Sequence, residues 1–498
     1  MKKLICFIFS LLLMESVWSQ EVNKFVVAKY SCTSSDGKVL IGCIIKDYKG
    51  DYPKDKFVIP ETIGKKRVLA IDDYAFRGCD ELKKKYGFKG PLILPQTIVS
   101  IGKYAFNGCD GLTGDLILPS LLKNIGMCAF ADCKGFNGKL SLSPTLKHIG
   151  MSAFDSCFNL TGSLTIPSSL MSIESSVFRY CGKLSGSLIL PLSVRSVGDE
   201  AFRGCENLSG NLILPSSLKI IGEAAFAGCS KLTGSLVFPS SVKYIGGSAF
   251  KDCHGLTGPL RLPQAINFME ASTFSGCNGL DGSLTLPSTL TFIGEDCFRA
   301  CSGLTGELKL PSTLTSIERG SFYGCKGLTG SLVLPSSLTI IGASAFRGCS
   351  GFTGSLVMPK YITYVDESVF EGCSHLTGEL RLPSSITSIR RSAFAGCCSF
   401  SGDLTIPSSV TSIGYSAFAG CNGFTGKLSL PSSLTSIRDE AFKECDHFSD
   451  VVSLALIPPV IGKEVFPKVA TLYCPSPKLY KKAFGRKKFK QIKLSTDD

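Results

Sequence analysis

The chain has 498 residues, which would suggest several domains, but a sequence period of 24 residues instead indicates one elongated repeat protein. The formal net charge is +13, yet the sequence has no nucleic-acid recognition motif, and the export signal described below argues against a nucleic-acid partner. With four dispersed histidines, no Gly-rich phosphate loop and no zinc-protease helix, the sequence gives no support for an enzyme.

Residues 1–19 have the pattern of a secretory signal. Lys2 and Lys3 precede an apolar run from Leu4 to Met14, and small residues follow where a signal peptidase cleaves. The run is shorter than the about 20 apolar residues that span a bilayer, and no later segment is longer. We therefore predict an exported mature chain that begins at Gln20 and has no integral membrane segment.

Residues 20–70 precede the regular repeat and predict an N-terminal β cap. Within it, Cys32 and Cys43 flank "TSSDGKVLIG", which has the composition of a hairpin turn between two strands. Two cysteines on the arms of one hairpin could form a disulfide, and their redox state is left open at this point.

Residues 71–450 form an array of 24-residue units. Cysteine recurs every 24 residues from Cys109 to Cys445, with a phenylalanine three residues before each. In "GSLTLPSTL" (282–290) leucines alternate with polar residues, which predicts a short strand that a glycine opens and a proline ends. A second short strand, 291–294, follows, and "EDCFRAC" (295–301) predicts a helical turn that directs Phe298 inward.

Such a coil cannot bury its own apolar side, so copies must stack. The predicted fold is a repeat solenoid of the leucine-rich-repeat type, with parallel β-strands about 4.8 Å apart, short helical or irregular turns, and caps at both ends. Residues 451–498 predict a degenerate last coil and a basic C-terminal cap, because ten Lys or Arg residues and one Glu lie between Lys463 and Lys493.

The repeat unit resembles a known family. "IPSSVTSIGYSAFAGCNGFTG" (406–426) is similar to the unit of the BspA-like, or treponemal-class, leucine-rich repeats found in bacterial surface proteins, and the similarity extends over about 71–450. Units of that family are commonly one residue shorter. The resemblance implies a secreted or cell-surface adhesion protein, with host extracellular-matrix proteins or other cells as partners.

The cysteines of the repeat occupy one equivalent place in each coil. A small apolar side chain suits a buried ladder there, and side chains in register on parallel strands do not have the dihedral angle of a disulfide. We predict reduced, buried, structural thiols, without a metal, because tetrahedral sites cluster their ligands. Cys128, Cys297, Cys398 and Cys474 lie off this register and remain unassigned.

The predicted binding surface consists of outward positions at which the repeat varies. The place just before the inward residue of the second strand is usually small and polar, as at Ser172 and Ser196, but four successive coils carry Ile220, Tyr244, Phe268 and Phe292 there. Alternation turns this place outward, so the four side chains predict an exposed apolar stripe of the kind that marks an interaction site. In several coils the residue one position earlier is basic. We assign Lys147, Arg195, Lys219 and Lys243 to the predicted binding site.

Two alternatives stay open for this surface. The lysines are equally explained as solvated faces that keep a stacked protein soluble, and the aromatics as cover for a local irregularity, since Gln264 and Met269 also depart from the consensus. The predicted function is an exported, non-catalytic protein that binds a protein ligand, secreted, at the cell surface or in the periplasm, without a cofactor. The alternative is a carbohydrate-binding or cell-envelope scaffold protein.

Overall fold

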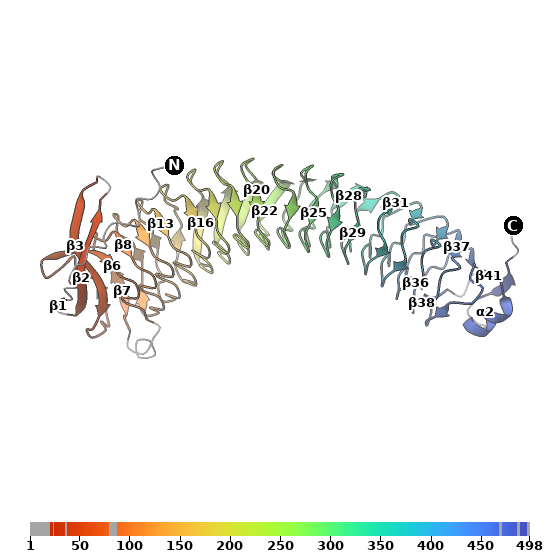
Figure 1. Cartoon of the computed structure of the whole chain (residues 1–498), viewed down its shortest axis with the longest axis horizontal. Helices are drawn as coiled ribbons and strands as arrows, with labels where there is room; N and C mark the ends of the chain where they lie inside the picture. The colour runs from red at the N-terminus through yellow and green to blue at the C-terminus, as the bar shows by residue number, and fades with distance from the viewer. Residues whose placement is uncertain are drawn as a thin grey trace. The chain divides into compact units, whose positions relative to one another are not determined.

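The computed structural model describes residues 20–22, 24–34, 37–78, 87–467, 471–485 and 489–495 (Figure 1). The chain divides into two compact units, 1–162 and 163–498. Strand β14 (Gly162–Ser163) contains the boundary between them. The predicted signal sequence and Cys79 lie outside the described residues.

The first unit begins with an antiparallel sheet that continues into parallel pairing. Strands β1 to β3 are antiparallel neighbours, and β3 pairs in parallel with β6, from which β8, β11 and β13 continue. Their bounds are β1 (Gln20–Val22), β2 (Phe25–Thr33), β3 (Val39–Tyr48), β6 (Lys66–Ile71), β8 (Ser100–Ile101), β11 (Asn124–Ile125) and β13 (His148–Ile149). The remaining strands are β4 (Phe57–Val58), β5 (Thr62–Ile63), β7 (Gly90–Ile93), β9 (Leu112–Thr113), β10 (Leu116–Ile117) and β12 (Leu140–Ser141).

The hairpin predicted between Cys32 and Cys43 forms, but the disulfide considered there is contradicted. Cys32 is opposite Leu40 and Cys43 is opposite Lys29 in the β2–β3 register. The two cysteines are therefore displaced by three residues along the strands, about 10 Å, which is beyond disulfide reach. Both thiols are free, and burial raises the pKa of each.

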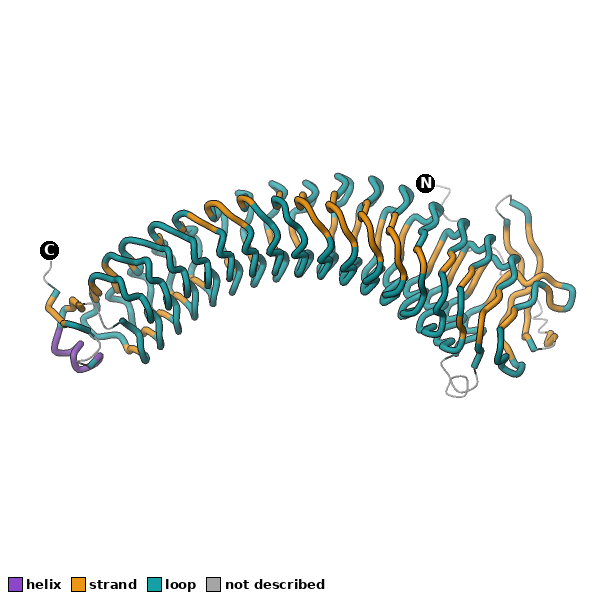
Figure 2. Tube along the Cα trace, turned by 180° about the vertical axis from the view of Figure 1, so that it is seen from behind, coloured by secondary structure: helices purple, strands orange, loops and turns teal. Residues whose placement is uncertain are grey.

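The second unit is a parallel β-solenoid in which each coil contributes two short strands, as Figure 2 shows for the orange segments. The first strands are β16 (Leu184–Ile189), β18 (Leu208–Ile213), β20 (Leu232–Val237), β22 (Leu256–Arg261), β24 (Leu284–Thr285), β26 (Gly306–Glu307), β28 (Leu328–Ser331), β30 (Phe352–Thr353), β31 (Leu356–Val357), β33 (Leu380–Arg381), β35 (Leu404–Thr405), β37 (Lys427–Leu430) and β39 (Asp450–Ser453). At the corner before such a strand, Gly306 has a φ of +79°, a conformation that strains residues with a Cβ.

The second strands of this unit fall into three separate parallel ladders. One contains β15 (Ser172–Ile173), β17 (Ser196–Val197), β19 (Ile220–Ile221) and β21 (Tyr244–Ile245). The next contains β23 (Phe268–Met269), β25 (Phe292–Ile293), β27 (Ser316–Ile317) and β29 (Ile340–Ile341). The third contains β32 (Tyr364–Val365), β34 (Ser388–Ile389), β36 (Ser412–Ile413), β38 (Ser436–Ile437) and β40 (Val460–Ile461).

The segment after the second strand is a chain of hydrogen-bonded turns rather than an α-helix. It drives phenylalanine inward as predicted, and Phe298 is fully buried. From Phe178 to Phe466 these rings stack on one another with centroids 5.2 to 5.8 Å apart. The stacked rings form the centre of the core of this unit.

Each cysteine of this turn is bound to the preceding coil. The Cys277 thiol donates to the Phe250 carbonyl at 3.0 Å, and the same carbonyl accepts the Cys253 N–H at 3.2 Å. Equivalent thiol bonds recur from Cys205 to Cys445. The predicted burial of these cysteines is confirmed, and the thiol is also a hydrogen-bond donor between coils.

The last coils lead into the one helix among the described residues, α2 (Pro477–Phe484). Strands β41 (Thr471–Cys474) and β42 (Gln491–Leu494) continue the ladder of β39, and α2 packs beside them (Figure 1). The Tyr480 hydroxyl is buried, 2.7 Å from the Ser453 hydroxyl, and donates to the Ala455 carbonyl at 2.7 Å. These bonds fix the helix to the segment that follows β39.

Candidate binding surface

Outward side chains of the second strands form the predicted stripe. Ile220, Phe268 and Phe292 are 46%, 40% and 36% exposed, and Tyr244 is half-buried. The residue that follows each of them points into the core. We call Ile220, Tyr244, Phe268 and Phe292 the outward stripe. Its exposure follows from strand alternation, whereas its role in binding stays a prediction.

The backbone under the outward stripe is interrupted once. Tyr244 ends one ladder and Phe268 begins the next, so among the described residues β21 and β23 are not paired. The two rings nevertheless meet, with centroids 6.2 Å apart. Phe292 pairs in register with Phe268 and with Ser316, inside a continuous ladder. The irregularity considered from Gln264 and Met269 is therefore present, but it adjoins only Tyr244 and Phe268.

The same row extends further than the sequence reasoning recognised. Ile340, 43% exposed, ends the second ladder, and Tyr364, half-buried, begins the third. Ser316 lies between Phe292 and Ile340 in register and is buried. Both missed residues occupy the 24-residue register of Ile220, and following that register beyond Phe292 would have found them.

Both interruptions coincide with the loss of a hydroxyl between coils. In most coils the residue two positions after the proline is serine or threonine. Its hydroxyl donates to a backbone carbonyl of the preceding coil, as the Ser241 hydroxyl does to the Leu218 carbonyl at 2.6 Å. The residue at this place is Ala265 at the first interruption and Tyr361 at the second. Leu121 and Ile457 also lack the hydroxyl, yet their second strands remain paired, so its loss is not sufficient. Other donors at this place are Thr97, Thr145, Ser217, Thr289, Thr313, Ser337, Ser385, Ser409 and Ser433, whereas the Ser193 hydroxyl has no partner among the described residues.

A row of cations adjoins the outward stripe. Arg195, Lys219 and Lys243 are exposed in successive coils, and their backbones are joined by bonds of 2.8 and 2.9 Å. None of the three forms an ion pair with another residue that the structure describes. Lys147, the fourth predicted basic residue, is exposed in the first unit. Three of the four predicted cations are thus brought together.

Carboxylates follow the stripe residues in the sequence, whereas the cations precede them. Asp199 and Glu223 follow the second strands of their coils, and Glu270 follows Met269. Burial raises the pKa of the Tyr244 hydroxyl, and Glu270, Asp199 and Glu223 raise it further. The outward stripe therefore presents apolar surface between charges of both signs.

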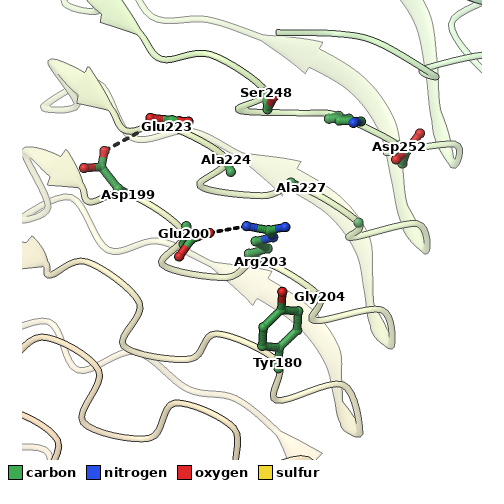
Figure 3. Close-up of a pocket in the computed structure, with 12 residues that line it drawn as sticks. Tyr180, Asp199, Glu200, Arg203, Gly204, Glu223, Ala224, Ala227, Ser248 and Asp252 are labelled. Carbon is green, nitrogen blue, oxygen red and sulfur yellow. Dashed lines mark hydrogen bonds and ion pairs between the residues drawn. The ribbon is translucent and has the colours of Figure 1, made fainter. Parts of the chain in front are cut away.

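An open hollow of about 580 Å³ lies beside the carboxylate row (Figure 3). Small residues, among them Ala224 and Ala227, leave space between the charged side chains. Burial alone would raise the pKa of Glu200, but hydrogen bonds from Arg203 and Arg179 hold it below its usual value. Glu200 and Arg203 are thus paired with each other, whereas Asp199, Glu223, Lys251 and Asp252 also line the hollow and form no ion pair with another residue that the structure describes.

Two further hollows lie at the interrupted coils. One of about 630 Å³ is lined by Val237, Phe238 and Arg261 among others. The other, of about 590 Å³, is lined at corresponding repeat positions by Val333, Leu334 and Val357. Exposed valines border both, at 68% for Val237 and 66% for Val333. Ile189 and Ile213, at the same repeat position in uninterrupted coils, are 63% and 58% exposed, so this apolar surface is not confined to the interruptions.

The comparisons with known proteins agree with this architecture. The family model for the BspA type leucine rich repeat region matches residues 70–209, 186–305, 305–424 and 389–496. The chain belongs to this family. A search of curated proteins found no match.

Solved structures of other leucine-rich-repeat proteins are similar to this BspA-type chain. A leucine-rich repeat protein from Bacteroides ovatus is 23% identical with a TM-score of 0.51, over 95% of this chain and 100% of that one. A leucine rich cell surface protein from Faecalibacterium prausnitzii is 25% identical with a TM-score of 0.38, over 88% and 95% of the two chains. The pneumococcal vaccine antigen PcpA is 19% identical with a TM-score of 0.39, over 97% and 99%. The likeness to the Bacteroides protein supports the fold alone.

Groups that could perform chemistry are dispersed along this BspA-type chain. Of the histidines, His254, His375 and His447 each contact a backbone carbonyl through Nδ1 at 2.5 to 2.7 Å. Of the unassigned cysteines, Cys398 is exposed, Cys128 is half-buried, and Cys297 and Cys474 are buried. Among the described residues, no three metal-binding side chains cluster. No helix within the described ranges has the length and apolarity to cross a membrane.

Proposed function

We propose that this protein is an exported, non-catalytic binding protein that engages a protein ligand through the outward stripe. The observation that carries the proposal is that four successive coils carry large apolar side chains, three exposed and one half-buried, at a place where seven other coils have serine. An exposed apolar stripe on a folded protein marks an interaction site. Membership of the BspA-type family supports a location outside the cell or on its surface.

Packing explains only part of the outward stripe. Tyr244 and Phe268 touch across the interruption, which is a structural role. Phe292 lies in a continuous ladder, where its neighbour in the next coil, Ser316, has a small side chain. No interruption adjoins Ile220 either, since β19 pairs with both β17 and β21. The exposed Phe292 and Ile220 therefore favour binding over local repair.

The charges around the outward stripe indicate what kind of ligand it would take. Lys219, Lys243 and Arg195 offer cations on one side, while Asp199 and Glu223 offer carboxylates on the other. An aromatic centre with charges at its rim is typical of a protein interface. We propose an extracellular protein as ligand, such as a host matrix protein or a protein of another cell surface. Lys147, the fourth predicted cation, is exposed in the first unit.

The triple variant Tyr244→Ser, Phe268→Ser and Phe292→Ser tests this proposal. Serine is the residue that other coils use at this place, so we expect the fold to persist while binding of a captured matrix protein weakens by at least about 2 kcal/mol. Circular dichroism and thermal unfolding would monitor the fold. Val333→Ser is the matched control, because it removes an exposed apolar side chain from the segment just after β28, away from the outward stripe.

The alternative function has a distinct outcome in the same experiment. A glycan array run beside the matrix pull-down would detect a carbohydrate-binding protein, and binding to neither would favour an envelope scaffold. Unchanged binding by the triple variant, or collapse of its thermal stability, would assign the outward stripe to packing. Export itself predicts an intact mass that begins at Gln20, without Trp18, the single tryptophan of the sequence.

A further inference from the structure

A second apolar surface lies in the coil that follows β39, far along the sequence from the outward stripe. Leu454, Leu456, Ile457 and Val460 are 54%, 75%, 81% and 74% exposed. We call these four residues the C-terminal apolar patch. Exposed fractions of this size mean that neighbouring atoms cover little of the side chains, which therefore project from the surface. Burial in the fold does not account for them.

The preceding coil shows that these positions do not need apolar residues. Val460 pairs in register with Ser436. Counting back by the same 24 residues, Leu456 and Ile457 correspond to Ser432 and Ser433. The Ser433 hydroxyl donates to the Val410 carbonyl at 2.7 Å, a bond that Ile457 cannot make. The last coil has therefore exchanged three polar positions for aliphatic ones without gaining buried area.

Cations accompany the patch. The bonds of the Tyr480 hydroxyl to Ser453 and Ala455 hold α2 against the segment that begins the patch. Lys478, Lys481 and Lys482 are exposed on this helix, next to Leu479, which is 49% exposed. The ion pairs found here among the described residues join Lys443 to Glu440 and Glu464, and none involves the lysines of α2. No carboxylate of the described residues therefore pairs with the lysines of α2.

We propose that the C-terminal apolar patch and the lysines of α2 dock the protein on an anionic lipid bilayer. Projecting aliphatic side chains can enter the soft boundary between headgroups and acyl chains, and nearby lysines are attracted to anionic headgroups. A second copy of the chain is a poorer occupant, because two surfaces rich in lysine would repel each other. Val460 shares the outward row of the stripe but lies seven coils beyond Phe292, so membrane docking and the outward stripe would use different residues.

Sedimentation with lipid vesicles tests the proposal. We expect the full chain to bind vesicles of phosphatidylcholine containing phosphatidylglycerol and to bind pure phosphatidylcholine at least about tenfold more weakly. The variant Leu456→Ser, Ile457→Ser and Val460→Ser restores the residues of the preceding coil, and it should lower the affinity for anionic vesicles at least about tenfold. All variants share one N-terminus, so the apolar residues 4–14 contribute equally to each.

The chain offers a matched control in Leu192→Ser. Leu192 occupies the repeat position of Leu456 and is 76% exposed, but it is distant in sequence from α2. Its replacement should leave vesicle binding unchanged. The proposal is overturned if the wild type ignores anionic vesicles or if the triple serine variant, folded by circular dichroism, binds as well as the wild type. Binding to soluble heparin but not to vesicles would instead assign the lysines to acidic glycans.

Discussion

The turns and the second strands of the second unit behave differently along the same stack. In the turns, stacked phenylalanines and thiol bonds continue past both interruptions, with Phe250 and Phe274 stacked at 5.5 Å and Phe346 and Phe370 at 5.8 Å. In the second strands, pairing lapses between β21 and β23 and again between β29 and β32. The turns thus hold neighbouring coils together where the strands do not.

The repeat can vary more freely in the second strands than in the turns. Each turn joins the turn of the next coil through a buried phenylalanine ring, a thiol hydrogen bond and backbone hydrogen bonds. In one of these, the Phe250 N–H donates to the Thr273 carbonyl at 2.9 Å. The second strands join neighbouring coils only through two-residue parallel pairings, and their outward side chains are mostly exposed or half-buried. A binding surface can therefore change on the strand face without loss of the stack, which is the central claim of this account.

Alkaline pH should break the turns, and this is the largest effect we expect. Burial raises the pKa of Cys229, Cys277, Cys325 and Cys373 to about 12. Because the folded pKa lies above the unfolded value, the thiols stabilise fully below pH 9, and that stability is lost as the pH rises towards 12. By pH 10, each of these thiols should have lowered the free energy of unfolding by about 1 kcal/mol.

Urea unfolding at pH 7, 8, 9 and 10 measures this loss. Replacing one ladder cysteine, by Cys277→Ala, should reduce the slope of unfolding free energy against pH, while the exposed Cys398→Ala should not. A free energy of unfolding that stays constant between pH 8 and pH 10 would contradict the prediction.

Two phenylalanines of one coil sharpen the comparison. Phe274 is fully buried and stacks on Phe250 and Phe298, so Phe274→Ala should destabilise by about 3 to 5 kcal/mol. Phe268, six residues earlier, is 40% exposed, so Phe268→Ser should cost less than about 1 kcal/mol. Urea unfolding at neutral pH compares the two variants. Equal decreases in the free energy of unfolding would mean that the second strand and the turn contribute equally to stability.

Restoring one hydroxyl at the first interruption should have the smallest effect. Ala265→Ser places a donor where Ser241 bonds Leu218, facing the Val242 carbonyl, and should stabilise by about 0.5 to 1.5 kcal/mol. The reverse change, Ser241→Ala, should destabilise by a similar amount. If Ala265→Ser has no effect while Ser241→Ala does, something other than the missing hydroxyl separates these coils.

The sequence predicted the repeat and most of the core because both follow from periodicity. Phenylalanine and cysteine at one fixed place must face the same environment in every coil, and Phe298 and Cys277 are buried as expected. Alternation also predicted the exposure of Ile220 and Phe292. These features depend only on which residue type stands at which place.

Features that depend on the fit between coils were not predictable in this way. The pairing of Cys32 with Cys43 fails because hairpin register, not sequence proximity, sets which residues face each other. The interruptions do not follow from residue type alone, since Leu121 lacks the same hydroxyl as Ala265 without a break. The thiol bond to the phenylalanine carbonyl requires a distance that the period does not encode.

Native-state hydrogen exchange within one coil, resolved to single amides, tests the central claim most directly. Exchange reports the free energy of local opening, so a weaker ladder opens more often. In the coil of Phe268 we expect the strand amides 266–270 to exchange at least about tenfold faster than the turn amides 272–277. In the uninterrupted coil of Phe292 the difference should be smaller. Equal protection of strand and turn beside the interruption, or faster exchange in the turn, would contradict the account.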